Sequence, residues 1–373
     1  MLSGQTAENP PMPLDLKPLT ALRFAAAAWV VSFHYWPVLA GAAIPMLVQK
    51  GYLGVEMFFV LSGFILCHVY LRGFGDGTFR YGAFLWARVA RVYPLHLAVL
   101  LGVAALAVVA GAAGLAVDSN LADWRSFPAN LLLLQAWGLA PEAAFNHPSW
   151  SVSAEWFAYL SFPAFAWVAW RLKDRPNMAV IGALILLFGA YAVFEYVAGF
   201  RLTQATIHWG ALRIVPCFAY GCAAYLLWRS EAIREKPQAK FWVAVFAMLW
   251  LGLAQINAPD GASVAVFGGL IVALGSLTST GSKLLSNRVG VYLGEVSYSV
   301  YMVCFPWKLV FVNVAEKVFG YTGGLPLALW LVMCAGVVPA AAVCHHLIER
   351  PARTALRRWG ERGYPMPLAA KAA

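Results

Sequence analysis

Ten apolar segments follow one another along the chain, each about as long as a lipid bilayer is thick. An α-helix rises about 1.5 Å per residue, so roughly 20 residues cross the hydrocarbon core. A helix is also one of the two structures that satisfy every backbone polar group in lipid. We therefore predict an all-α, polytopic membrane protein with about ten transmembrane helices, near residues 22–40, 52–71, 92–112, 150–170, 178–199, 211–228, 241–257, 262–280, 290–312 and 326–347.

The composition agrees with this prediction. Charged residues make up 12% of the chain and hydrophobic residues 61%, whereas a soluble domain carries about 25% charged residues. The net charge of +10 would favour nucleic acid as a partner of a soluble protein. Here the basic residues lie between apolar segments, so we expect the bilayer and anionic ligands as partners, and no nucleic acid.

The distribution of Lys and Arg predicts which loops are cytoplasmic. A further apolar run at 127–139 is too short for an ordinary span, and we expect it to be re-entrant or interfacial. If it crossed the bilayer, only ten Lys and Arg residues would lie on the cytoplasmic side. Ten spans with both termini in the cytoplasm place 21 of the 27 Lys and Arg residues on the cytoplasmic side, as the positive-inside rule favours. The other six are Lys50, Arg125, Arg201, Arg213, Lys308 and Lys317.

We expect one membrane domain between two short tails. The membrane domain covers 21–350 and lies between a cytoplasmic N-terminal tail (1–20) and a basic cytoplasmic C-terminal tail (351–373). The six cysteines lie in or beside apolar segments without the spacing of a metal site. We interpret them as packing residues and expect no metal.

Arg23 and His34 stand out in the first apolar segment. Eleven residues turn a helix about 20° past three full turns, so the two share one face, about 16 Å apart. An ionisable group at that depth is costly and usually faces a polar cavity. Arg23 could instead be a snorkelling boundary residue, and His34 an interhelical hydrogen-bonding group. Histidine is also the side chain best suited to move a proton near neutral pH.

A basic cluster precedes the third expected span. Arg88 and Arg91 are three residues apart and project from neighbouring places on a helix, and Arg80 is nearby. The cluster could be an anchor that obeys the positive-inside rule. Paired guanidinium groups also bind phosphates well, so we predict that these three residues bind the phosphates of a ligand.

Three other expected spans contain polar residues, which are candidate substrate contacts. Ser151 and Glu155 share a face at the start of the fourth span, where they could bind hydroxyls or cap the helix. Glu155 could also orient His34. Ser153 lies in the same group, with helix capping as its alternative. The other candidates are Ser62 and, with interhelical packing as the alternative, Tyr298 and Tyr301.

These motifs, in this order, resemble the acyltransferase 3 family of integral membrane enzymes. The resemblance includes the Arg23–His34 spacing, "GYLGVEMFFVLSGF", "RVARVYP", "WSVSAEW", "GEVSYSVYMVCFPW" and "HHLIERPAR". It implies ten spanning helices and acyl transfer, most often of acetyl from cytoplasmic acetyl-CoA, to an extracytoplasmic carbohydrate. It also implies that His34 is the key catalytic residue, that Arg23 supports it, and that Arg88 and Arg91 engage the donor. A bacterial inner membrane is implied as the location.

The chain departs from the family pattern at Cys304, where relatives often have histidine. Cys304 could carry the acyl group as a nucleophile, or it could be an inert buried thiol. His34 could act as a general base or as a transient acyl carrier. Composition and spacing alone would equally suit a secondary transporter, and a non-enzymatic partner in polysaccharide assembly is a further alternative.

Overall fold

The computed structural model describes residues 16–114, 121–230, 238–277 and 286–363. These residues form α-helices and short turns, without a β-strand and with an isolated bridge between Leu39 and Leu325. The all-α prediction is confirmed for this part of the chain. The helices are α1 (Lys17–Tyr35), α2 (Met46–Gln49), α3 (Gly54–Gly75), α4 (Tyr81–Ala112), α5 (Phe127–Leu131), α6 (Trp150–Leu160), α7 (Phe162–Arg171), α8 (Pro176–Ala198), α9 (Gly210–Arg229), α10 (Ala239–Gln255), α11 (Asp260–Gly275), α12 (Arg288–Phe319), α13 (Leu327–Cys344) and α14 (Arg350–Gly363).

Six helical stretches in the described residues are long and apolar enough to cross a bilayer. The helices α10 and α11 are also apolar but have only 17 and 16 residues. The expected total of ten spans and the cytoplasmic position of both termini stay predictions. The six stretches are Met46–Gly75, Tyr81–Ala112, Pro176–Ala198, Gly210–Arg229, Arg288–Phe319 and Leu327–Gly360.

Two expected segments are interrupted helices. The segment 150–170 divides at Ser161 into α6 and α7, because Pro163 in the first turn of α7 has no N–H to continue the ladder. The run 127–139 forms α5, of five residues, and a 3₁₀ turn at Gln135–Trp137. Neither piece is long enough to cross a bilayer.

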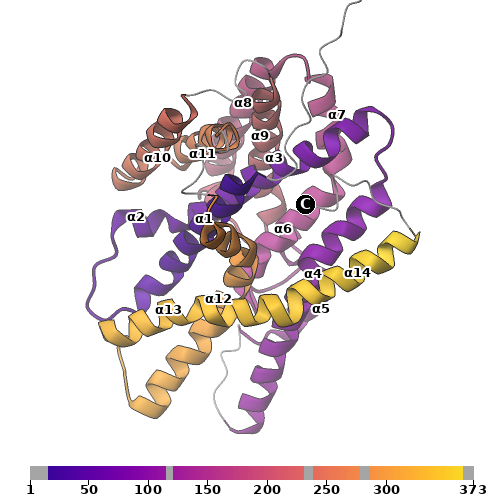
Figure 1. Cartoon of the computed structure of the whole chain (residues 1–373). Helices are drawn as coiled ribbons and strands as arrows, with labels where there is room; N and C mark the ends of the chain where they lie inside the picture. The colour runs from indigo at the N-terminus through magenta and orange to yellow at the C-terminus, as the bar shows by residue number, and fades with distance from the viewer. Residues whose placement is uncertain (1–15, 115–120, 231–237, 278–285, 364–373) are drawn as a thin grey trace, which may run out of the picture.

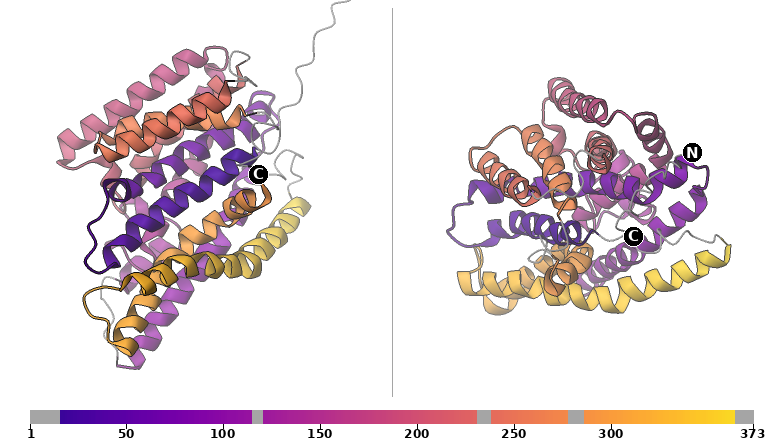
Figure 2. Two further views of the ribbon diagram at one scale, coloured as in Figure 1. Left: turned by 60° about the vertical axis from the view of Figure 1, so that its left-hand side comes forward. Right: turned by 45° about the horizontal axis from the view of Figure 1, so that its top comes forward.

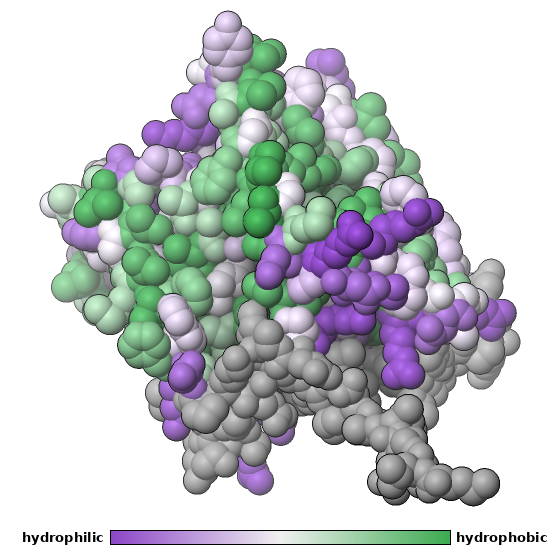
Figure 3. All heavy atoms as spheres, turned by 90° about the horizontal axis from the view of Figure 1, so that it is seen from above, coloured by the Kyte–Doolittle hydropathy of each residue, from purple (hydrophilic) through white to green (hydrophobic). Residues whose placement is uncertain are grey.

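The outer surface is rich in large apolar side chains. They come mainly from helices that lie at the edge of the molecule, and one view shows broad hydrophobic areas beside a cluster of hydrophilic residues (Figure 3). A soluble monomer rarely exposes so much contiguous apolar surface, so this is a membrane protein. Examples are Met178, Ile181 and Ile185 on α8, Met248 and Leu251 on α10, and Leu331 and Val332 on α13.

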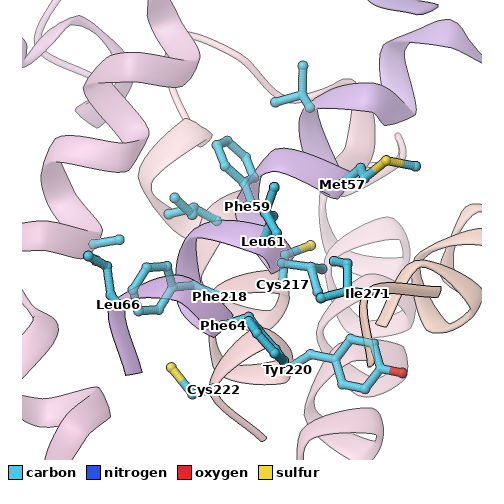
Figure 4. Packing of buried hydrophobic residues seen from close by; sticks show 14 of the residues in the cluster. Met57, Phe59, Leu61, Phe64, Leu66, Cys217, Phe218, Tyr220, Cys222 and Ile271 are labelled. Carbon is cyan, nitrogen blue, oxygen red and sulfur yellow. The ribbon is translucent and has the colours of Figure 1, made fainter. Parts of the chain in front are cut away.

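The long helices pack side by side in pairs. The helix α3 contacts α9 most extensively, and α1 lies against α12 (Figures 1 and 2). Apolar side chains of α3 and α9, with Ile271 of α11, interlock at the centre of the molecule (Figure 4). The helices α13 and α14 continue one another through a π-helical turn at His345–Glu349 and run along one side (Figure 1).

Two glycines let the backbones of α3 and α9 touch. A Cβ on Gly63 would collide with the carbonyl of Phe218, and a Cβ on Gly221 with the carbonyl of Val60. Small residues of this kind drive helix association in lipid, where hydrophobicity alone does not. The crossing fixes α3, which carries much of the site described below.

Gly221→Ala is expected to lower the free energy of unfolding by about 1–3 kcal/mol, because α3 and α9 must separate to admit the methyl group. Thermal unfolding of the protein in nanodiscs measures this change. Gly189→Ala on α8 is the matched control, since a Cβ there meets nothing within 4 Å. Equal unfolding midpoints for the two variants would contradict the close crossing.

Candidate functional site

A cavity of about 130 Å³ lies between α1, α3, α4, α6 and α12. Most of its polar lining consists of residues that the sequence analysis selected. The structure therefore brings together side chains from five helices that are far apart in the chain. The predicted residues that line it are Arg23, Ser62, Arg88, Arg91, Ser151, Glu155, Tyr298 and Tyr301.

Arg88 is held in an aromatic enclosure on one side of the cavity. It is only 3% exposed, and its Nη2 donates to the hydroxyl of Tyr70 at 3.3 Å. Its guanidinium lies 5.7–6.0 Å from the ring centres of Tyr70, Phe84 and Tyr159. Cation–π attraction stabilises a buried guanidinium without neutralising its charge, so Arg88 can still attract an anion.

A carboxylate lies among the arginines. Ser62 donates to Oε1 of Glu155 at 2.8 Å, and Arg91 and Glu155 are among the charged neighbours of Arg23. The site thus has three guanidinium groups around one carboxylate. Glu155 orients toward Ser62 and this cluster.

Tyrosines and serines close the cavity on its other side. Ser151 and Tyr301 share a hydrogen bond of 2.7 Å, and the Tyr301 hydroxyl also reaches the carbonyl of Pro148 at 2.9 Å. The Tyr298 hydroxyl donates to the carbonyl of Val92 at 2.6 Å. These bonds fix the tyrosine hydroxyls at the cavity wall.

Three predicted residues do not line this cavity. Arg80 is exposed just before α4. The hydroxyl of Ser153 donates to the carbonyl of Leu133 at 2.7 Å and accepts from the N–H of Ala136 at 3.0 Å. Ser153 therefore fastens the interrupted segment 127–139 to α6. The third residue, His34, lies elsewhere.

His34 lies in the last turn of α1, half-buried. Its ionisable neighbours are Lys308 and His147, and the ammonium of Lys308 donates to the His34 carbonyl at 3.2 Å. Burial and the nearby Lys308 ammonium lower the pKa of His147. No local pattern in the sequence joins Lys308 or His147 to His34.

A proline explains how His147 reaches this position. Pro306 in α12 has no N–H, which frees the carbonyl of Met302 four residues earlier. The Asn146 amide donates to that carbonyl at 3.0 Å. The loop before α6 is thereby held against α12, with His147 next to its anchor.

Cys304 is fully buried in α12. Its thiol donates to the carbonyl of Tyr301 at 3.0 Å, and its own carbonyl accepts from the Tyr35 hydroxyl at 2.7 Å. These contacts join α1 to α12 and suit a packing residue.

The motif "HHLIERPAR" contributes a second polar cluster. Glu349, which is 1% exposed, accepts from Ser299 at 2.7 Å and lies 3.0 Å from Nδ1 of His345. Arg353 is 3.9 Å from its other oxygen. Glu349 is also a charged neighbour of Arg23, and π-helical turns such as the one that carries it are frequent at functional sites.

The helix α14 adds positive charge beside α4. Trp86 donates to the carbonyl of Leu356 at 2.7 Å and packs on Trp359. On α14, Arg353 has Arg91 as a charged neighbour and Arg357 has Arg88. Residues 1–15 and 364–373, which hold most of the expected tails, lie outside the described residues.

Comparison with known proteins identifies the family. A family model described as an acyltransferase domain, Acyl_transf_3, matches residues 17–346. The acyltransferase MdmB of Streptomyces mycarofaciens is 27% identical over 94% of this chain and 94% of its own length. A Staphylococcus aureus (strain COL) protein provisionally named an O-acetyltransferase is 22% identical over 81% of this chain, which spans 53% of that relative. Protein 2 of the picA locus of Rhizobium radiobacter is 37% identical over 25% of this chain and 46% of its own length.

No solved structure matches the chain significantly. The family match covers most of the chain and includes every helix from α1 to α13. This membrane protein belongs to the acyltransferase 3 family.

Proposed function

We propose that the protein is a membrane O-acyltransferase that moves an acyl group, most simply acetyl, from cytoplasmic acyl-CoA to a hydroxyl of an extracytoplasmic carbohydrate. The observation that carries this proposal is the cavity in which Arg23, Arg88 and Arg91 surround Glu155, with His34 eleven residues along α1 from Arg23. Three guanidinium groups exceed the charge of one carboxylate, so the site favours an anionic ligand.

The size of the cavity determines which part of the donor it can hold. Pockets that enclose a drug-sized ligand measure roughly 300–1,000 Å³, whereas this cavity measures about 130 Å³. We therefore infer that it takes the slender pantetheine arm, whose acyl end reaches toward His34. The nucleotide phosphates would lie outside, where α4 and α14 bring Arg88 and Arg91 close to Arg353 and Arg357.

The chemistry then takes place near the far end of α1. His34 would take the proton of the acceptor hydroxyl as a general base, or carry the acyl group transiently. Arg23 and Glu155 would position the donor arm between the phosphates and His34. The distance of about 16 Å along α1 from Arg23 to His34 suits an extended donor arm.

The transferred group, the acceptor and the location are supported by different observations. The name of the Staphylococcus aureus relative supports acetyl transfer to oxygen, and MdmB supports acyl transfer in general. The carbohydrate acceptor and the bacterial inner membrane come from the family resemblance. A secondary transporter would instead accumulate a solute without consuming acyl-CoA.

The Arg88→Ala/Arg91→Ala double variant is expected to weaken acetyl-CoA binding about 100-fold or more, because two charge-assisted contacts contribute about 1.5–3 kcal/mol each. Binding of radiolabelled acetyl-CoA to the purified protein in nanodiscs measures this loss. Hydrolysis of acetyl-CoA, which needs no known acceptor, reports turnover in the same samples.

Arg171→Ala is the matched control, since this arginine packs on Trp167 at the end of α7, away from the cavity. It should bind acetyl-CoA as the wild type does. Unchanged binding in the double variant would overturn the donor site, and solute uptake without acyl-CoA turnover would overturn the enzyme.

A further inference from the structure

Lys308 is a cation in the membrane domain that the proposed function has not used. It lies on α12 one turn after Cys304, and it is half-buried. Its Nζ donates to the carbonyl of His34 at 3.2 Å. An ammonium has three N–H donors, so two remain to meet a ligand.

The charge of Lys308 is not neutralised by a carboxylate of the described residues. Lys50, also inside the protein, differs in this respect. Its Nζ forms a 2.7 Å ion pair with Asp260 and also donates to the carbonyl of Ala258. Ionisable residues at membrane depth often mark a functional pathway. Lys308 has the His34 carbonyl and the ring of Phe305, 6.0 Å away, as its partners.

Other features of the same region also indicate a ligand site. Oδ1 of Asn146 is fully buried and has no hydrogen-bond partner in the described part of the chain. The preceding residue, Phe145, has a φ of +58°, a strained conformation that is found most often at functional sites. His147, which follows Asn146, is a neighbour of both His34 and Lys308.

We propose that the Lys308 ammonium stabilises the oxyanion that forms on the thioester carbonyl during acyl transfer at His34. The proposal rests on the function proposed above. Preorganised positive charge at the position of a developing oxyanion is usually the largest electrostatic contribution to acyl transfer. Lys308 is held in place by α1 itself, through the carbonyl of the residue that acts as the base.

In the general-base route, the proton of the acceptor moves first to His34 and then to the leaving thiolate. The acceptor hydroxyl gives its proton to the His34 imidazole, and its oxygen bonds to the thioester carbonyl carbon. The π electron pair of the carbonyl moves onto oxygen, which Lys308 faces. When the carbonyl forms again, the C–S bond breaks, and the thiolate of CoA takes the proton from the imidazolium. Water can replace the acceptor, which gives acetate and CoA.

A purely structural role must be distinguished from this one, because Lys308 also caps the C-terminal end of α1. Three variants separate the roles. Lys308→Arg keeps the charge and the N–H donors, Lys308→Gln keeps an N–H donor without the charge, and Lys308→Met loses both. Lys317→Gln, an exposed site on the same helix, is the control.

The experiment measures acetyl-CoA binding, kcat for acetyl-CoA hydrolysis and thermal unfolding for the full chain in nanodiscs. Lys308→Gln and Lys308→Met are expected to lower kcat roughly 10²-fold with unchanged acetyl-CoA binding, and Lys308→Arg should retain most of the rate. A Lys308→Gln variant as active as the wild type would overturn the oxyanion role and leave the capping role. If His34→Ala is inactive while all three Lys308 variants are active, only this inference fails. If the wild type turns over no acyl-CoA, the proposed function fails with it.

Discussion

His34→Ala is expected to reduce acetyl-CoA hydrolysis and acyl transfer by roughly 10²–10⁴-fold, the contribution of a positioned general base. The donor should still bind, because His34 does not line the cavity that holds Arg23, Arg88 and Arg91. The ring nitrogens of His34 have no hydrogen-bond partner among the described residues, so the substitution leaves no polar group without its partner. The protein should therefore fold as the wild type does.

Turnover, acetyl-CoA binding and thermal unfolding measured on the same preparation check these three expectations. His208→Ala is the matched control, since His208 is exposed and should be dispensable. A folded His34→Ala variant with full turnover would remove His34 from the mechanism. Loss of turnover together with loss of donor binding would place His34 in donor recognition instead.

The same histidine allows the two chemical routes to be separated. If His34 carries the acyl group, the wild type incubated with radiolabelled acetyl-CoA should retain protein-bound label, and His34→Ala should not. If His34 is a general base, no label is retained after denaturation. Retention of label in His34→Ala but not in Cys304→Ala would assign the acyl carrier to Cys304.

Arg213→Ala is expected to cost about 3–5 kcal/mol of stability, because it leaves a buried carboxylate without its partner. Arg213 and Glu56 are 2% and 0% exposed, and Nε of Arg213 lies 2.5 Å from Oε1 of Glu56. The guanidinium also donates to the carbonyl of Ala205 at 2.8 Å and lies 4.6 Å from the ring centre of Trp150. One side chain thus joins α3, α9 and the start of α6.

Thermal unfolding in nanodiscs and the fraction of monodisperse protein after purification measure this loss. The double variant Glu56→Leu/Arg213→Met should lose less than Arg213→Ala alone, since no charge is left buried. Arg201→Ala is the control, because Arg201 is exposed and lies 3.9 Å from Asp260. An Arg213→Ala protein as stable as this control would show that the ion pair contributes little.

Much of the helical framework follows from local sequence. Apolar runs predicted the positions of α3, α8, α9 and α13 to within a few residues, because a helix in lipid satisfies its hydrogen bonds within one segment. The start of α4 at Tyr81 was missed, since its first turns carry arginines and do not look apolar. The division between α6 and α7 was missed as well, although Pro163 was a visible signal.

Prediction of the cavity-lining residues succeeded where single polar side chains interrupt apolar helices. Arg23, Glu155 and Tyr301 were selected on this basis and line the cavity. Tyr159 also lines it and was missed, although it follows Glu155 by one helical turn. Ser153 also interrupts an apolar helix, but its hydroxyl bonds to the backbone of Leu133 and Ala136. Polar residues in membrane helices join helices to one another as well as binding ligands.

Local sequence is enough to show that the chain is helical, that it lies in a membrane, and which polar side chains are exceptions within apolar helices. These properties depend on segment length, on hydrogen bonds within a helix and on the cost of polar groups in lipid. Which of these polar side chains meet depends on how the helices pack together. Lys308 reaches the carbonyl of His34 across 274 residues of sequence, and α14 returns to α4 through Trp86 and Leu356 across 270. Lipid and protein interior are equally apolar, so hydrophobicity cannot tell which face of a helix meets its neighbour, and close packing of the faces makes that choice.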